Sequence, residues 1–158
     1  MKIQRILLCG LALLLLVGCA KKTTTSYYAS APTYLNDEAD GSITVRAYGQ
    51  GRNRSDAIEQ AAKNAVRQVL FKGINVPGNV LLSKPLVTAV NAEEKYQNFF
   101  NAFFADGGAY MQFTSTEDRR PGTNTKEKNA VQRKYATTVR VLRPQLRNYL
   151  IENGIIVP

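Results

Sequence analysis

The most reactive side chains in this sequence are two cysteines, and the chain has no histidine to assist them. Cys9 lies inside an apolar run and Cys19 follows it. Without imidazole, neither Ser-His-Asp nor Cys-His catalysis can be assembled, and the usual zinc and iron sites lose their preferred nitrogen ligand. Two cysteines are also too few for a disulfide scaffold. The chemistry that the cysteines themselves still suggest is covalent modification of a thiol.

The residues before Cys19 have the pattern of a signal for lipid attachment. Lys2 and Arg5 form a short basic region, and residues 6–16 are almost wholly apolar, which is typical of a secretory signal peptide. That run is shorter than the about 20 apolar residues that a membrane-spanning helix needs. It ends in Leu16-Val17-Gly18-Cys19, which matches the bacterial lipobox. The alternative is an uncleaved signal anchor with a chance cysteine.

The chain therefore resembles a bacterial lipoprotein precursor. The resemblance implies that residues 1–18 are removed, together with Cys9, and that Cys19 is acylated as the first mature residue. No thiol then remains for a nucleophile, a disulfide or a metal, and we expect neither a metal nor a cofactor. The attached lipid is enough for stable anchoring, since each buried methylene contributes about 0.8 kcal/mol. Ala20 in place of an aspartate favours the outer membrane, and no acidic export cluster follows, which favours the periplasmic face over the cell surface.

Behind the anchor, composition predicts a tether and one folded domain. Residues 20–41 are rich in Ser, Thr, Ala and Tyr and have neither a 3.6-residue nor a 2-residue period, which predicts that residues 19–41 are the lipidated cysteine and a flexible tether. Residues 42–158 are long enough to bury a core, and we expect them to form a single α+β domain.

The first part of this domain has the clearest periodicity. Residues 42–48 alternate as a half-buried strand, and Gly49-Gln50-Gly51 follows as a turn. A helix capped by Asn53 or Ser55 then runs to Gly73. Its apolar stripe is rich in alanine, which predicts that the helix backbone lies close to a sheet. No third glycine and no Gly-Lys-Ser/Thr follow the Gly-x-Gly, which favours a plain structural turn over a phosphate-binding loop.

The rest of the domain has weaker signals. The apolar residues of 74–91 are expected to be mostly buried: Val80, Leu81, Leu82, Leu86, Val87 and Val90. A helix at 92–105 carries a phenylalanine stripe, which is an aromatic binding site or, more often, core. Strands at 109–116 and 129–142 form a hairpin, and a last helix begins at Pro144. The apolar tail 155–157 packs somewhere, for example as an edge strand.

The order βααββα predicts an antiparallel sheet of three to four strands with about three helices packed on one face. By alternation, the opposite face combines basic and aromatic side chains, a mixture enriched at interfaces. We therefore predict an interaction face there, with an ordinary solvated surface as the alternative. Its six members are Arg46, Tyr48, Tyr110, Gln112, Lys134 and Arg140.

Charge indicates the kind of partner. The chain has 21 basic and 12 acidic residues, net +9. Nucleic acid is not expected as the partner of an anchored envelope protein. Anionic lipid headgroups, lipopolysaccharide or the acidic face of a protein fit better, and the alternative is a solubilising surface. The acidic residues lie at helix starts and in loops, and none form an evident catalytic pair.

One segment has a family resemblance. Its strand ends in Gly49 and Gly51, and the helix continues as Asp56-Ala57-Ile58 with Ala61 or Ala62 and Ala65. This segment, residues 42–73, resembles the N-terminal domain of flagellar assembly protein T and of related small envelope lipoproteins. The resemblance implies an α+β fold and a role in assembly or adhesion without catalysis.

The sequence thus favours a non-enzymatic outer-membrane lipoprotein that binds a protein partner or an anionic envelope component. Two alternatives stay open. One is a glycan-binding, peptidoglycan-binding or hydrolytic lipoprotein that uses loop carboxylates in a pocket. The other is a structural lipoprotein that self-associates through its apolar tail.

Overall fold

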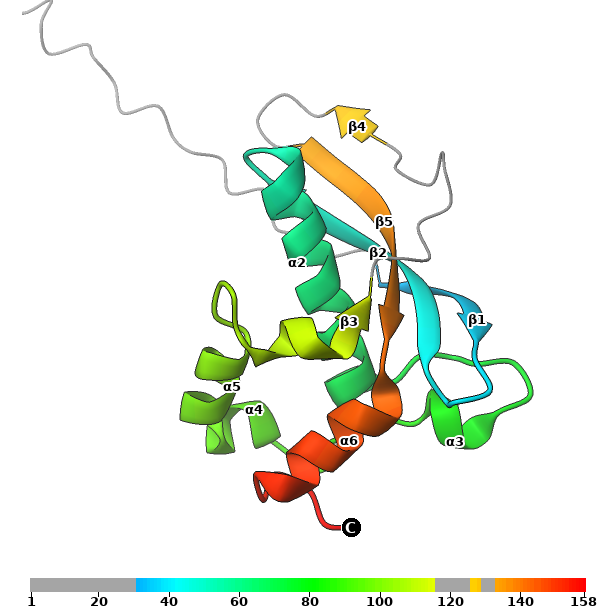
Figure 1. Cartoon of the computed structure of the whole chain (residues 1–158), viewed down its shortest axis with the longest axis vertical. Coiled ribbons are helices and arrows are strands. Elements are labelled where there is room, and N and C mark those ends of the chain that lie inside the picture. Colours follow the sequence, from blue (N-terminus) through cyan, green and yellow to red (C-terminus); the bar gives the residue numbers. More distant parts are fainter. Residues whose placement is uncertain (1–30, 116–125, 129–132) are drawn as a thin grey trace, which may run out of the picture.

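The structure is a computed structural model, and it describes residues 31–115, 126–128 and 133–158 (Figure 1). The expected signal peptide, the lipobox with Cys19 and the first part of the tether lie outside these residues. Arg119 and Arg120, in the charged connection 117–128 between the two strands of the predicted hairpin, also lie outside them.

The described residues form one antiparallel sheet with helical segments packed against it, which confirms the α+β class. At its centre, β2 (Ile43–Gly51) pairs with β5 (Arg133–Val141) over nine residue pairs. β1 (Thr33–Asp37) lies on the outer edge of β2, and β3 (Thr114–Ser115) and β4 (Lys126–Lys128) pair with opposite ends of β5. The sheet has five strands, two of them very short, in place of the three to four expected.

Strand β1 lies inside the segment predicted to be a flexible tether, so that prediction is wrong for residues 33–37. β1 pairs with β2 from Thr33 opposite Arg46 to Asp37 opposite Ile43, with a bulge between Tyr34 and Asn36. The bulge interrupts the 2-residue period, which explains why the sequence shows no strand pattern here. The folded domain therefore begins before the Ser42 boundary.

The helix α2 (Arg54–Arg67) confirms the prediction for the alanine-rich segment. The side chain of Asn53 caps it by accepting a hydrogen bond from the backbone N–H of Asp56 at 2.9 Å. A π-helical turn, η1 (Gln68–Lys72), extends it to Gly73, whose φ of 77° ends the helix as expected. Ala57, Ala61 and Ala65 are fully buried.

The small stripe lets α2 lie directly against β2. A Cβ built on Gly49 would come within 1.8 Å of the carbonyl oxygen of Ala57 and 2.5 Å of the backbone nitrogen of Ala61. A Cβ on Gly51 would come within 2.6 Å of the nitrogen of Ala57. The two glycines therefore belong to the strand, and they leave room for the helix backbone rather than forming the expected turn.

Two short helices replace the helix predicted at 92–105. α4 (Ala92–Lys95) and α5 (Gln97–Phe103) meet at Tyr96, whose φ of −111° and ψ of 34° break the helix. Phe100, Phe103 and Phe104 are buried in a chain of ring contacts; the Phe100 ring lies 5.0 Å from that of Phe71. The phenylalanine stripe is therefore core.

The segment before these helices differs most from the prediction. α3 (Val80–Ser83) is one turn long. Only Val87 of the six apolar residues is buried; Leu82 and Leu86 are half-buried. Val80, Leu81 and Val90 are 71%, 75% and 87% exposed, so the expectation of burial is wrong for them. An apolar run without a period does not say which of its residues reach the core.

The predicted strand at 109–116 is mostly a 3₁₀ helix, η2 (Ala109–Phe113), followed by the two residues of β3. In a 3₁₀ helix, residues i and i+3 lie on the same side. Tyr110 and Phe113 therefore both point into the core, while Met111 and Gln112 are exposed. Over only five residues, a period of three resembles the alternation of a strand, so the strand predicted for 109–113 is wrong.

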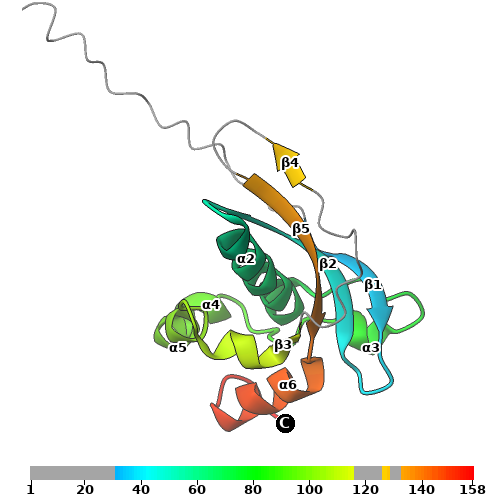
Figure 2. The same ribbon diagram turned by 45° about the horizontal axis from the view of Figure 1, so that its top comes forward.

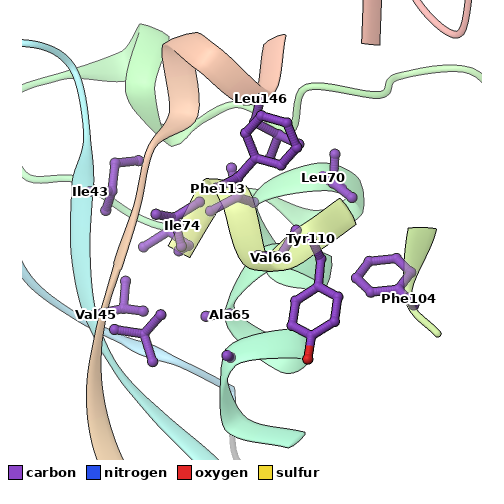
Figure 3. Close-up of a cluster of buried hydrophobic side chains, with 14 of the residues drawn as sticks. Ile43, Val45, Ala65, Val66, Leu70, Ile74, Phe104, Tyr110, Phe113 and Leu146 are labelled. Atoms are coloured by element: carbon purple, nitrogen blue, oxygen red, sulfur yellow. The ribbon is translucent and has the colours of Figure 1, made fainter. Parts of the chain in front are cut away.

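The last helix, α6 (Arg143–Glu152), has Pro144 in its first turn and buries Leu146 and Leu150 completely. Ile155 of the tail is buried, but the tail does not form a strand. In Figures 1 and 2, α2, α4, α5 and α6 lie on one side of β2 and β5, while α3 lies beside the β1–β2 end of the sheet. The helices are more numerous and shorter than the three expected. The core lies between the sheet and the helical layer that includes α2, η2 and α6, with Ile43, Tyr110 and Leu146 among its members (Figure 3).

Candidate functional site

The register of the central strands brings three predicted interface residues together. Arg46 lies opposite Thr138, Tyr48 opposite Ala136, and Thr44 opposite Arg140. Because directly paired residues share a side of the sheet, these side chains form one surface, which faces away from α2. We call it the second sheet face. It consists of Thr44, Arg46, Tyr48, Ala136, Thr138 and Arg140.

The centre of the second sheet face is covered. Thr44, Ala136 and Thr138 are only 6%, 2% and 3% exposed. Arg46 and Tyr48 are half-buried, as is Arg140. The part of this face that solvent reaches is therefore the outer portion of the longer side chains, not an open floor of small residues.

Arg140 is joined to the turn between β1 and β2. Its Nη2 donates to Oδ2 of Asp40 at 3.2 Å. The same carboxylate accepts hydrogen bonds from the backbone N–H of Ser42 at 2.9 Å and from its hydroxyl at 3.0 Å. These bonds from Ser42, and then the charge of Arg140, lower the pKa of the Asp40 carboxyl below its ordinary 3.8. Arg140 thus links the second sheet face to the turn between β1 and β2.

The Asp40 carboxylate makes stability depend on acid. Because its pKa is lower in the folded than in the unfolded chain, its contribution is complete above the ordinary pKa and is lost as the pH falls below it. We expect Asp40→Asn to lower stability at pH 7 and to have a smaller effect at a pH below about 4. Urea unfolding of both proteins at the two pH values measures this; an equal effect at both would contradict it.

Tyr110 and Gln112 do not belong to the second sheet face, so this part of the predicted interface is wrong. Tyr110 is 1% exposed and lies beside Phe104, with 6.2 Å between the ring centroids (Figure 3). Gln112 is exposed on η2 rather than on a strand. The error follows from the 3₁₀ helix, because both residues were assigned to the second face by strand alternation.

The remaining predicted positions have less structural description. Lys134 lies in β5 opposite Gln50, at a register position consistent with the second sheet face. Lys126 and Lys128, in the charged connection 117–128, are in β4. Cys19, the predicted lipidation site, lies outside the described residues.

A polar cluster that the sequence analysis missed joins α2 to the turn after α5. Lys63 Nζ lies 3.2 Å from Oε1 of Glu59 and 2.6 Å from Oδ1 of Asp106. The Tyr110 hydroxyl donates to Oε1 of Glu59 at 2.9 Å, and Lys63 Nζ lies 5.3 Å from the Tyr110 ring centroid. The i, i+4 spacing of Glu59 and Lys63 was the signal in the sequence, but their partners come from a distant segment.

Two members of this cluster, Lys63 and Tyr110, have raised pKa values. Burial disfavours the charged form of Lys63, but the bonds from Lys63 to Asp106 and Glu59 outweigh it and raise the Lys63 pKa. Burial, and then the bond to Glu59, raise the pKa of the Tyr110 hydroxyl. Lys63 therefore remains an ammonium and Tyr110 a neutral phenol at neutral pH. The cluster links α2 to the turn after α5, and groups that keep their protons at neutral pH do not suit the role of a general acid or base.

We expect Tyr110→Phe to cost about 1 kcal/mol of unfolding free energy, because one hydrogen bond is lost while Glu59 keeps Lys63 as a partner. Urea denaturation measures this, with Tyr96→Phe as the control. No loss in Tyr110→Phe relative to this control would contradict a stabilising role for the Tyr110–Glu59 bond.

Within residues 31–115, 126–128 and 133–158, no three His, Cys, Asp or Glu residues gather in an arrangement that would hold a metal ion. Among these same residues, no helix has the length and apolar character needed to cross a bilayer. Comparison of the chain with protein families, with curated proteins and with solved structures gave no match in any of the three.

Proposed function

We propose that this protein is a non-enzymatic lipoprotein of the outer membrane whose α+β domain binds a protein partner or an anionic component of the envelope. The observation that carries the proposal is the Leu16-Val17-Gly18-Cys19 sequence directly after a basic and then apolar segment. In this account, lipid on Cys19 holds the domain at the periplasmic face of the membrane. The resemblance of residues 42–73 to envelope assembly domains supports a binding role.

Charge supports an anionic partner. Removal of residues 1–18 takes away two basic residues, Lys2 and Arg5, so the mature chain would keep 19 basic and 12 acidic residues, net +7. Such an excess favours association with acidic surfaces. Arg46 and Tyr48 lie two residues apart on the second sheet face, and both types of side chain are enriched in interfaces. This face is the binding surface that we propose.

Affinity capture from detergent-solubilised membranes tests the binding role. The bait is the full lipoprotein, compared with an anchorless protein of residues 31–158. The start at residue 31 matters because a protein that begins at residue 42 would lack β1, the edge strand paired with β2. We expect both baits to retain the same partner. Recovery of no partner by either would contradict the binding module.

A single charge reversal tests the proposed face. Arg140 is unsuitable, because its reversal also breaks the pair with Asp40 in the β1–β2 turn. We expect Arg46→Glu to weaken capture of the partner. Arg52→Glu, which makes the same charge change at an exposed position outside this face, is the matched control. Equal capture by the two variants would show that the partner binds elsewhere.

A further inference from the structure

Helix α3 holds two large apolar side chains out into solvent. Val80 is 71% exposed and Leu81 is 75% exposed. α3 lies beside the end of the sheet where β1 and β2 meet, in both Figure 1 and Figure 2. Val80 and Leu81 are consecutive residues of α3, and two large exposed apolar side chains next to each other are a candidate contact surface.

Hydrogen bonds hold the backbone of α3 in place, so Val80 and Leu81 are exposed at fixed positions. The side chain of Asn79 caps α3 by accepting a hydrogen bond from the N–H of Leu82 at 3.0 Å. The hydroxyl of Ser83 accepts from the N–H of Val76 at 2.9 Å. From α6, Nη2 of Arg143 donates to the carbonyl oxygens of Leu81 and Lys84, at 3.1 Å each.

The exposed charges that flank α3 along the chain are basic. From residue 60 to residue 92 the chain has no Asp or Glu. Lys63 and Arg67 in this range are paired with carboxylates, whereas Lys72 and Lys84 are exposed at the two ends of the segment that contains α3. The β1–β2 turn has the carboxylates of Asp37, Glu38 and Asp40, and that of Asp40 is paired with Arg140.

Exposed apolar side chains with basic neighbours are the composition of segments that lie in the interface of a lipid bilayer. The apolar groups enter the boundary between headgroups and acyl chains, and the amines stay at the level of the phosphates. A bilayer offers an apolar layer to Val80 and Leu81 and phosphates to the lysines, and the proposed anchor at Cys19 already places it beside the domain.

The length of chain before the domain keeps a bilayer within reach. Residues 20–30 separate Cys19 from the first described residue, and a fully extended chain of that length spans at most about 40 Å. A domain of this size has a diameter of roughly 35 Å. A domain anchored through Cys19 would therefore remain within about one diameter of the membrane at all times.

We infer that α3 is a second membrane contact, which inserts Val80 and Leu81 into the headgroup region of the bilayer and so fixes which side of the domain faces outward. The inference rests on the proposed lipid anchor at Cys19. In this arrangement Lys72 and Lys84 lie at the lipid phosphates.

The absence of tryptophan from the chain gives a clean test. Leu81→Trp places a single fluorescent reporter on α3, and Val80→Trp is a second one. Ser55→Trp is the control, because Ser55 is exposed at the start of α2. It lies 18 residues before Gly73, which adjoins α3, a separation of about 27 Å along the helix. The full lipoproteins are reconstituted in vesicles of phosphatidylethanolamine and phosphatidylglycerol, with and without brominated lipid.

We expect brominated lipid to quench Leu81→Trp and Val80→Trp roughly twofold or more above Ser55→Trp, since only α3 reaches the acyl boundary. Equal quenching in protein that carries palmitate would overturn this inference and leave the anchor intact. Protein without palmitate would overturn the anchor, and the inference with it. Shielding of Leu81→Trp from acrylamide in cell membranes but not in pure vesicles would mean that a protein covers α3, which would also overturn the inference.

Discussion

Gly49→Ala is expected to destabilise the domain by about 3 kcal/mol, because the added methyl group has no space between β2 and α2. The atoms that it would meet are backbone atoms of Ala57 and Ala61, the nearer at 1.8 Å. Backbone atoms in the middle of a helix cannot turn away as a flexible side chain can. The change therefore requires α2 to move away from the sheet and opens the core behind it.

Urea unfolding of Gly49→Ala measures this cost, and Gln50→Ala in the same strand is the matched control. Gln50 lies between the two glycines and therefore on the opposite side of β2, away from α2, so its truncation leaves the helix contact intact. We expect the control to change stability by less than about 1 kcal/mol. Similar effects of both substitutions would show that α2 does not pack on β2 as closely as described.

The second large effect is expected at Phe100, where substitution by alanine should cost about 3–5 kcal/mol. Phe100 is 2% exposed, and its ring contacts those of Phe71 at 5.0 Å and Phe99 at 5.1 Å in edge-to-face geometry. Its removal leaves a cavity lined by the remaining rings and forfeits these aromatic contacts.

Thermal and urea unfolding of Phe100→Ala test this assignment, with Asn101→Ala as the control. Asn101 is the next residue of α5 and is exposed, so its truncation should leave stability nearly unchanged. If Phe100→Ala were as stable as the control, the phenylalanine stripe would not be core. An aromatic binding site would then have to be considered again.

Periodicity predicted the parts of the fold in which one regular element has one buried face. Ile43, Val45 and Ala47 of β2 alternate with more polar residues, and the apolar stripe of α2 recurs at helical spacing. The local sequence pattern therefore predicts both elements. The close approach of the two was foreseen from the alanines. The role of Gly49 was not, because a glycine in a strand and a glycine in a turn look alike until the neighbouring helix is placed.

Prediction failed where tertiary contacts decide the structure. β1 depends on pairing with β2 and has an interrupted pattern, so nothing local distinguishes Thr33–Asp37 from a tether. The exposed Val80 and Leu81 were expected to be core, because composition alone assigns apolar residues to the interior. Tyr110 was placed on a sheet face and instead belongs to the core, with its hydroxyl on Glu59.

The candidate site was predictable only in part, for the same reason. Arg46, Tyr48 and Arg140 share a face because β2 and β5 are the regular strands that alternation describes well. The pair between Arg140 and Asp40 joins residues 100 positions apart in sequence, and no local pattern encodes it. The charge, the apolar residues 6–16 and the Leu16-Val17-Gly18-Cys19 motif are properties of the sequence itself.

The measurement that tests the central proposal most directly is metabolic labelling with radioactive palmitate in a bacterium that expresses the full chain. We predict that the wild-type protein and Cys9→Ala incorporate the label and fractionate with the outer membrane, whereas Cys19→Ala does neither. Cys9 is the matched control because it is the only other cysteine of the chain. Labelling that survives in Cys19→Ala, or a wild-type protein that takes up no palmitate, would contradict the proposal that this chain is a lipoprotein.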